Sequence, residues 1–116
     1  MSIERIGVGS RMSRAVVHGD TIYVSGQVAD AAAGAGVVEQ TREILALIDG
    51  VLAEAGSDKT KLVSAVIYLT DIATFAQMNE AWEAWIAPGR PPARATVEAK
   101  LVSPKYAVEI AVIAAR

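Results

Sequence analysis

Cysteine is absent from the 116 residues, and other residues that commonly carry chemistry are scarce. The chain holds one histidine, and aromatic residues make up only 5% of it. Without cysteine there is no disulfide, no thiolate nucleophile and no cysteine-ligated zinc. The lone His18 has no second histidine to share a metal and no identifiable serine partner for a catalytic triad. We therefore predict no metal site and interpret His18 as a residue of a surface turn.

The chain also lacks an excess of basic charge and a long apolar run. It carries 11 basic and 13 acidic residues, for a net charge of −2, and no basic cluster of the kind that neutralises phosphates. No stretch approaches the ~20 apolar residues that span a bilayer, and the start, MSIERIGVGSRM, has no signal-peptide core. We expect a cytoplasmic protein that binds neither nucleic acid nor membrane.

Aliphatic residues, by contrast, are abundant. Hydrophobic residues make up 53% of the chain, mostly as Ala, Val, Ile and Leu. The length fits one domain over residues 1–116 and leaves no room for a second core. Because a small domain buries a limited fraction of its own surface, the apolar excess indicates further burial between subunits.

Hydrophobic periodicity predicts the order β-β-β-α-β-α-β-β. The second and third strands, joined by Gly19-Asp20, have the form of a hairpin. The residues from 28 to 36 have no clear period and are expected to form a loop. The expected strands cover residues 3–8, 14–18, 21–24, 62–69, 93–99 and 106–114.

Two amphipathic helices are expected. An apolar stripe from Val38 to Ala55 predicts the first, which Gly56 ends, and Gln40 is assigned to its polar surface. The second runs from about 73 to 86, with Asp71 or Thr74 as a candidate cap. Its inward stripe is predicted to be Phe75, Met78, Trp82 and Ile86.

The arrangement of these elements predicts an α+β fold with one mixed sheet. Strand–helix–strand connections favour some parallel pairing with right-handed crossovers, so both helices are expected on one face of the sheet. The opposite face remains apolar, and a bare apolar sheet face is a surface for self-association. Its expected residues include Val66, Tyr68, Val97 and Val108.

Two charged residues lie inside otherwise apolar strands. Arg94, in PPARATVEA, faces away from Ala93, Ala95 and Val97, and Glu109 interrupts AVEIAVIAA. A charge in such a strand is costly unless it is paired or used. One interpretation is an ion pair between adjacent strands, Arg94 with Glu109 or Glu98, at an oligomer interface. The other is a binding or catalytic site.

Several segments, in this order, resemble the YjgF/RidA (reactive intermediate deaminase) family, in a divergent subgroup. The match covers nearly all of the chain from Arg14 onward. The segments are GDTIYVSGQ (19–27), Gln40-Thr41-Arg42, EAGSD (54–58), AVIYLTDIATFAQMNEAW (65–82), PARATVEA (92–99) and VEIAVIAA (108–115). The resemblance implies a chorismate-mutase-like fold with a six-stranded sheet. It also implies a homotrimer whose sheets face an inner barrel and whose sites lie between neighbouring subunits.

The resemblance further implies a cofactor-free hydrolase. Such proteins convert small reactive 2-imino or enamine acids, for example 2-aminoacrylate, into 2-keto acids and ammonia. Arg94 stands where the family's arginine binds the substrate carboxylate, and Glu109 matches a glutamate that orients the water or accepts its proton. A guanidinium fork suits this task because it binds a carboxylate bidentately and keeps its charge.

Further positions carry over around the substrate. Thr96 matches a residue whose backbone contacts it, and Gly26 and Ser25 match the SGQ signature, although both also suit a plain strand end. Asn79 has a counterpart near the site, but it also reads as a helix-surface amide. Met12 replaces a tyrosine that closes over the substrate from the next subunit, which favours a larger or more apolar imino acid.

Two other functions remain open. A non-catalytic sensor or chaperone-like trimer that binds a small carboxylate would use the same Arg94 and would explain Met12. An endoribonuclease, an activity ascribed to some relatives, is disfavoured by the net negative charge and by the lack of a histidine pair.

Overall fold

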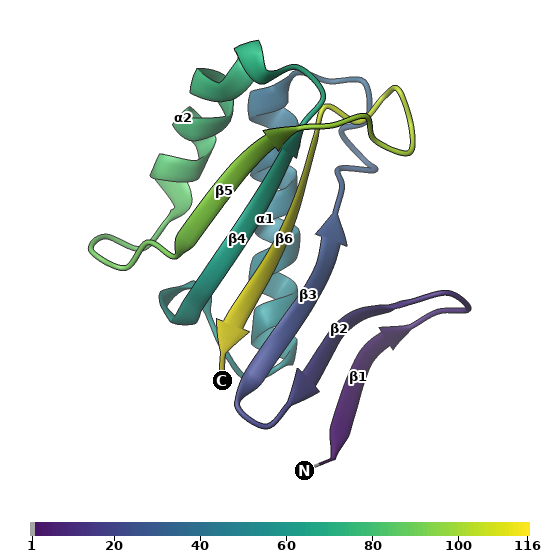
Figure 1. Cartoon of the computed structure of the whole chain (residues 1–116), viewed down its shortest axis with the longest axis vertical. Coiled ribbons are helices and arrows are strands. Elements are labelled where there is room, and N and C mark those ends of the chain that lie inside the picture. The colour runs from purple at the N-terminus through teal and green to yellow at the C-terminus, as the bar shows by residue number, and fades with distance from the viewer. Residues whose placement is uncertain (1) are drawn as a thin grey trace.

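The computed structural model describes residues 2–116 and shows one six-stranded sheet in the order β1-β2-β3-β6-β4-β5. Two α-helices pack against this sheet (Figure 1). The elements are β1 (Ile3–Val8), β2 (Ser13–His18), β3 (Thr21–Gln27), α1 (Val37–Glu54), β4 (Leu62–Leu69), α2 (Phe75–Trp85), β5 (Ala93–Glu98) and β6 (Val108–Ala115), with short 3₁₀ turns η1 (Lys59–Lys61) and η2 (Ile72–Thr74).

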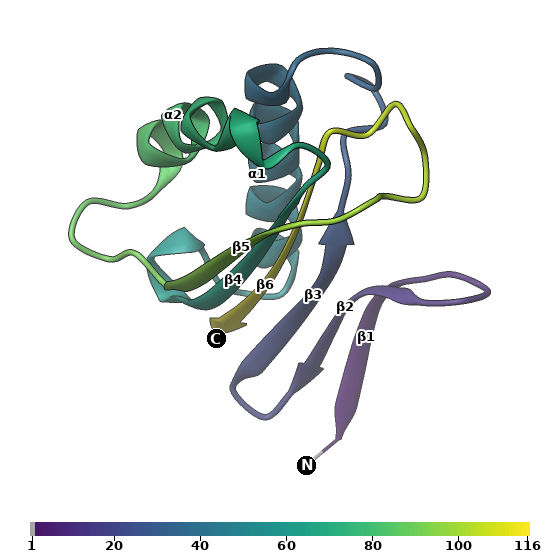
Figure 2. The same ribbon diagram turned by 45° about the horizontal axis from the view of Figure 1, so that its top comes forward.

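The sheet is mixed because one pair of strands is parallel. β4 and β5 run parallel and are joined through α2, whereas every other neighbouring pair is antiparallel. α1 and α2 lie on the same side of the sheet, and β1 and β5 form its two edges (Figure 2). The predicted α+β mixed sheet with both helices on one face is confirmed.

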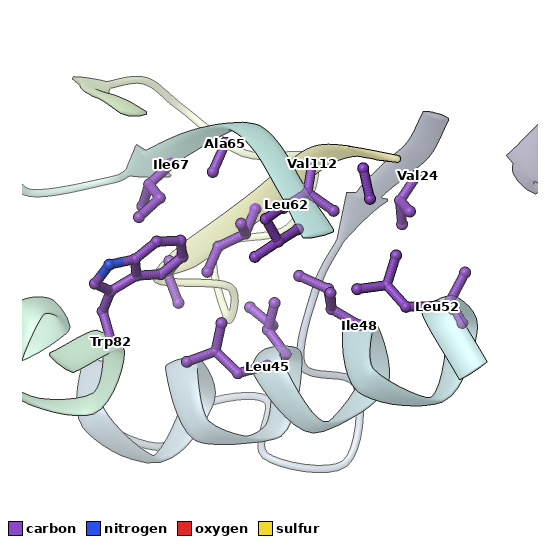
Figure 3. Close-up of a cluster of buried hydrophobic side chains, with 14 of the residues drawn as sticks. Val24, Leu45, Ile48, Leu52, Leu62, Ala65, Ile67, Trp82 and Val112 are labelled. Atoms are coloured by element: carbon purple, nitrogen blue, oxygen red, sulfur yellow. The ribbon is translucent and has the colours of Figure 1, made fainter. Parts of the chain in front are cut away.

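The core lies between α1, α2 and the inner strands. Apolar residues recur along α1 at helical spacing, so one stripe faces the sheet. Figure 3 shows Leu45, Ile48 and Leu52 beneath the strands, with Trp82 of α2 beside Ile67. The stripe differs from the prediction at its start, where Val37 is buried and Val38 only partly so.

Gln40 contradicts its assignment to the polar surface of α1, because it is fully buried. Its Nε2 donates to the carbonyl oxygens of Ala35, at 2.8 Å, and Lys105, at 3.0 Å. Its Oε1 accepts from the backbone N–H of Ala107 at 2.9 Å. A buried amide is tolerated when its polar atoms have partners, and here those partners are backbone groups of two loops. Gln40 therefore ties the start of α1 to the loop before β6.

The open face of the sheet is apolar, as predicted, but one residue was assigned to the wrong side. Val66, Tyr68 and Val97 alternate with core residues and face away from the helices. Val108 is fully buried beneath the helices, and Glu109 takes the open face instead. Because side chains alternate with a period of two, an error of one position reverses the assignment.

The glycine turns follow the sequence signals, and of the two candidate caps only Asp71 makes a capping hydrogen bond. Gly19 and Gly56 have φ values of +62° and +82°, the left-handed region that favours glycine. Asp71 caps η2 by accepting from the N–H of Ala73, and Thr74 makes no side-chain cap on α2. In residues 2–116, no helix is long and apolar enough to cross a membrane.

Candidate functional site

Arg94 projects from the edge strand β5 toward the helices. In the parallel register, Arg94 lies opposite Ala65 and Thr96 lies opposite Ile67, and both partners belong to the core under the helices. The alternation along β5 therefore directs Arg94 and Thr96 to the helix side, as predicted. Because β5 is an edge strand, its outer row of backbone groups is also without a partner strand.

The guanidinium of Arg94 lies against two aromatic rings of α2. Its Cζ is 5.7 Å from the ring centroid of Phe75 and 5.3 Å from that of Trp82, both within cation–π range. No ion pair involves Arg94 anywhere in residues 2–116; the pairs found there join Arg14 to Glu54 and Arg116 to Glu4. The N–H donors of Arg94 are therefore not engaged by an acid.

The ion-pair interpretation of Arg94 is wrong for a single chain. Glu109 lies on β6, which is separated from β5 by β4, and it faces the opposite side of the sheet, across from Tyr68. Glu98 uses its Oε2 to accept from the N–H of Ile72, at 3.0 Å. Neither carboxylate pairs with Arg94.

Gly26 brings the backbone of β3 against the carboxylate of Glu109. The register between β3 and β6 shifts between Val24 and Gln27, which places Gly26 in an irregular stretch. A Cβ added to Gly26 would lie 2.8 Å from Cδ of Glu109 and closer still to Oε2. Only glycine allows this approach without displacing the carboxylate. The structure thus shows a close approach at Gly26, and its role at the substrate stays a prediction.

Ser25, Gly26 and Met12 line a cavity of about 670 Å³. Ser25 Oγ donates to the carbonyl oxygen of Arg14 at 3.0 Å, which ties β3 to β2 and fits its interpretation as a strand-closing residue. Met12 is 57% exposed at the cavity rim. The opposite wall comes from α1, chiefly Leu47 and Val51.

Asp30, at the same cavity, is tied to the loop before β6. The hydroxyl of Tyr106 donates to the carboxylate of Asp30. This hydrogen bond is the main reason why the pKa of Tyr106 is raised above its ordinary value. The cavity is thus bordered by a fixed loop as well as by strands.

The predicted site residues form two groups on one chain. Arg94, Thr96 and Asn79 make up the first, which we call the β5–α2 group; Asn79 is half-buried and lies four residues after Phe75, hence on the same side of α2. Glu109, Gly26, Ser25 and Met12 make up the second group, which we call the β3 group. The first group lies at the β5 edge of the sheet and on α2, whereas the second lies on β3, on β6 and in the turn between β1 and β2.

The distance between the two groups is too large for one chain to close. β3 and β5 are separated by β6 and β4, which gives three strand spacings or about 14 Å. Glu109 also lies on the other face from Arg94. The arrangement can therefore form one site only if each group meets its counterpart on another chain.

The open sheet face around Glu109 offers a surface for such a meeting. Glu109 lies beside Tyr68, which pairs with Val97 on its other side. Tyr23 is on the same face, opposite Ile113, which lies four residues further along β6 from Glu109, and Tyr23 and Val97 are 48% and 42% exposed. In the described chain, no three His, Asp or Glu side chains converge as metal ligands would. The chemistry available is a free guanidinium, a carboxylate and unpaired edge backbone.

Phe75 and Trp82 were missed as contacts of Arg94. The sequence analysis placed both in the inward stripe of the second helix, but Phe75 is 41% exposed and meets the guanidinium instead. The available signal was their spacing. Two aromatics seven residues apart share a helix face, and this helix leads directly into the strand that carries Arg94.

Comparisons with known proteins agree with this fold. The model of the family described as Endoribonuclease L-PSP matches residues 2–116. The RutC family protein YoaB of Escherichia coli is 45% identical, over 99% of both chains. NMB1025 of Neisseria meningitidis, a YjgF family protein of solved structure, is 46% identical with a TM-score of 0.96, over 100% of this chain and 96% of its own. A protein of Capra hircus named 2-iminobutanoate/2-iminopropanoate deaminase is 36% identical over 88% of this chain and 77% of its own.

Proposed function

This chain belongs to the YjgF/RutC/Rid family, and we propose that it hydrolyses small 2-imino acids to 2-keto acids and ammonia. The name of the goat relative supports this reaction class. The observation that carries the proposal is the guanidinium of Arg94, which no acid engages in the described chain and which aromatic rings hold at the helix side of β5. A cytoplasmic location remains a prediction.

Arg94 binds the substrate carboxylate in this proposal. A guanidinium presents two parallel donors to a carboxylate and keeps its charge at any working pH. Fixing the carboxylate orients the adjacent imine carbon toward water, and orientation of this kind supplies part of the barrier reduction. Edge backbone at Thr96 and the amide of Asn79 lie in the same group and would complete the grip on the substrate.

In this proposal, Glu109 of a neighbouring chain acts at the imine end of the substrate. Water adds to the imine carbon while the carboxylate accepts its proton. That proton passes to nitrogen and gives a carbinolamine. The proton of the new hydroxyl group then moves to nitrogen as the carbon–nitrogen bond breaks, ammonia leaves, and the carbon becomes a ketone. No electron transfer occurs, so the proposal includes no cofactor. Gly26 allows the carboxylate to lie close to the β3 backbone, where the substrate would enter.

We propose a homotrimer. The need of the β5–α2 group of one chain for the β3 group of another supports an oligomer, and the number three is what the family resemblance implies. The exposed apolar face of the sheet supports packing against further copies. Closed cyclic assembly would give every chain one partner on each side, and therefore equivalent sites. The distance of three strand spacings between β3 and β5 supports a site that is shared between chains.

The direct test generates 2-imino acids with an amino-acid oxidase and follows 2-keto acid formation. Arg94→Ala is expected to lower kcat/KM by roughly ten- to hundredfold, the range of a lost charged hydrogen bond. Arg94→Lys should retain part of the activity, because it keeps the charge but loses the fork. Arg90→Ala removes an exposed arginine four residues earlier and serves as the control. An unchanged Arg94→Ala enzyme, or no acceleration over buffer on any imine, would refute the proposal.

A second candidate is a non-catalytic trimer that binds a small carboxylate, and Met12 favours it because the cavity rim has no hydroxyl at that position. Thermal stabilisation by 2-keto acids without imine turnover would support it. Endoribonuclease activity, which the family description names, has less support: the chain carries a net charge of −2 and its one histidine, His18, ends strand β2. If nuclease activity persists through purification and is lost in Arg94→Ala, the endoribonuclease would become the better supported of these two candidates.

A further inference from the structure

Arg94 is held in place by aromatic ring faces where an arginine in an apolar strand would ordinarily have an acid. Its Cζ lies 5.3 Å from the Trp82 ring centroid and 5.7 Å from that of Phe75. Trp82 is buried in the core, close to Ala65 and Ile67 of β4 (Figure 3). Phe75, the first residue of α2, is 41% exposed. The guanidinium is therefore bordered by one fixed ring and one ring at the surface.

The choice of partner matters for binding. An acid beside Arg94 would occupy N–H donors and cancel its charge, whereas a ring face attracts the cation through its quadrupole and takes no donor. Glu98, the acid on the same side of β5 as Arg94, lies four residues along the strand, about 13 Å away. Its carboxylate accepts from the N–H of Ile72. No hydrogen bond or ion pair of Arg94 is found in residues 2–116, so its donors remain available to a ligand.

The buried ring is itself braced from the first helix. Trp82 packs against Trp85 with ring centroids 5.6 Å apart and planes tilted by 54°. Trp85 Nε1 donates to Oδ2 of Asp49 on α1 at 2.9 Å, and the Nζ of Lys59 lies 5.2 Å from the Trp85 ring centroid. A continuous series of contacts therefore runs from α1 through both tryptophans to the guanidinium.

We propose that Phe75 and Trp82 are positioning residues for Arg94, holding its guanidinium by their ring faces so that its donors stay free for a substrate carboxylate. The inference rests on the proposed function for the identity of the substrate, but the aromatic contact itself does not. Both rings act through Arg94 and need no contact with the reacting carbon.

Phe75 gives the cleaner test because it is exposed, so its replacement leaves the core intact. Phe75→Leu is expected to raise the Kd for 2-oxobutanoate, used as a non-reacting carboxylate probe, by about two- to fivefold, the range for one exposed cation–π contact. For imine hydrolysis the same factor should appear in KM with kcat nearly unchanged, since carboxylate binding is common to ground and transition states. Phe75→Tyr keeps a ring face and should restore wild-type values.

Ile72→Ala is the matched control, because Ile72 lies three residues earlier, is similarly exposed at 44% and makes no cation–π contact with Arg94. A spectroscopic readout is independent of turnover. The Nε–H proton of Arg94 should show an upfield ring-current shift in wild type, Phe75→Tyr and Ile72→Ala that is reduced in Phe75→Leu. Trp82→Phe and Trp82→Leu form a second pair of variants. Both disturb the packing of the core, but only Trp82→Leu removes the ring and should lose the upfield shift of the Arg94 Nε–H proton.

The outcomes separate this proposal from the proposed function. Wild type that hydrolyses no imine, but binds 2-oxobutanoate with a Phe75-dependent Kd, would refute the deaminase and support the positioning role. Imine turnover, together with the same Kd and the same Arg94 Nε–H shift in wild type and Phe75→Leu, would support the deaminase and refute the positioning role. The positioning role is also overturned if Ile72→Ala matches Phe75→Leu, or if no binding of 2-oxobutanoate is found.

Discussion

At the scale of single residues, the position of Arg94 in an apolar strand is explained by its surroundings. The strand lies at the sheet edge, the side chain is only half-buried, and its flat guanidinium packs on aromatic faces. A buried charge without a partner is costly, but a half-buried one with two ring contacts keeps much of its hydration. The charge can therefore remain unpaired until a ligand arrives.

Gly26→Ala tests the close approach of β3 to Glu109. The added methyl group would overlap the carboxylate, which must then move. Since misplacement of a catalytic group by about 1 Å can cost a hundredfold, we expect kcat/KM to fall by roughly ten- to hundredfold. Gly36→Ala, at a position with no heavy atom within 4 Å of the added Cβ, is the control in the same imine assay. Equal activity of the two variants would show that the approach has no catalytic role.

Thr41→Val tests the energetic cost of an unsatisfied buried hydroxyl group in α1. Thr41 is fully buried, and its Oγ1 has no hydrogen-bond partner among the described residues. Replacing the hydroxyl by a methyl group of the same shape removes an unsatisfied polar atom, so the free energy of unfolding should rise by about 1 kcal/mol. Urea denaturation measures this change. Thr41→Ser keeps the hydroxyl, loses a methyl group and should lower the free energy of unfolding. A Thr41→Val variant that is less stable than wild type would contradict the assignment of Oγ1 as an unsatisfied atom.

At the scale of elements, the loops around the cavity are fixed from α1 and β6. Gln40 donates to the carbonyls of Ala35 and Lys105 and accepts from Ala107, and Tyr106 donates to Asp30. These contacts join the segment before α1 to the segment before β6. The cavity next to Gly26 is thereby bordered by loops that hydrogen bonds hold together.

Gln40→Leu should weaken this junction strongly. Three backbone groups would lose their partner, and each buried unpaired group costs about 1–3 kcal/mol. We therefore expect the free energy of unfolding to fall by at least ~2 kcal/mol. Glu39→Leu, an adjacent and exposed substitution, should change it by less than ~0.5 kcal/mol. Denaturant titration of both variants provides the measurement, and equal values would refute the role of Gln40.

The Tyr106–Asp30 hydrogen bond predicts a dependence of stability on pH. This bond, with a smaller effect of desolvation, raises the pKa of Tyr106 above its ordinary value of 10.0. The folded state thus holds the phenolic proton more tightly than the unfolded state, so the contribution is complete below about pH 10 and is lost as pH rises through the folded pKa. The stability difference between wild type and Tyr106→Phe should be constant between about pH 8 and about pH 9 and should shrink above about pH 10. A difference that stays constant over the whole range in urea titrations would contradict this.

Most elements could be predicted from the sequence because their signals are local. The stripe of α1, the Gly19 turn and the alternation of Arg94 with Ala95 each depend on residues a few positions apart. Gln40 could not be placed, because its partners Lys105 and Ala107 are distant in the chain. Val108 was assigned to the wrong face because the pattern AVEIAVIAA is apolar on both sides, so alternation alone does not fix the register.

At the scale of the whole molecule, the separation of the two groups of site residues is the main feature. The sequence, read with the family resemblance, predicts candidate site residues but no distances between them. The strand order provides those distances, since β6 and β4 lie between β3 and β5. In the proposed function, the site is therefore shared between two chains.

Val97→Lys should disrupt that assembly. Val97 lies on the open face beside Tyr68, where a buried ammonium group would be costly in a subunit interface. We expect a smaller species in analytical ultracentrifugation, with loss of imine hydrolysis. Val102→Lys, at a 90% exposed loop position, should keep the size and activity of wild type. A Val97→Lys protein that sediments as wild type would exclude this face as the interface.

The most direct test of the shared site is to mix two inactive variants. Arg94→Ala keeps Glu109, and Glu109→Gln keeps Arg94, so a mixed ring holds one site in which both groups are native. If the groups come from different chains of a cyclic trimer, unfolding and refolding an equal mixture should restore about one quarter of wild-type imine hydrolysis, because three quarters of the trimers are mixed and each has one intact site in three. No recovery above the separate variants, with mixed trimers verified by mass, would contradict a site built from two chains.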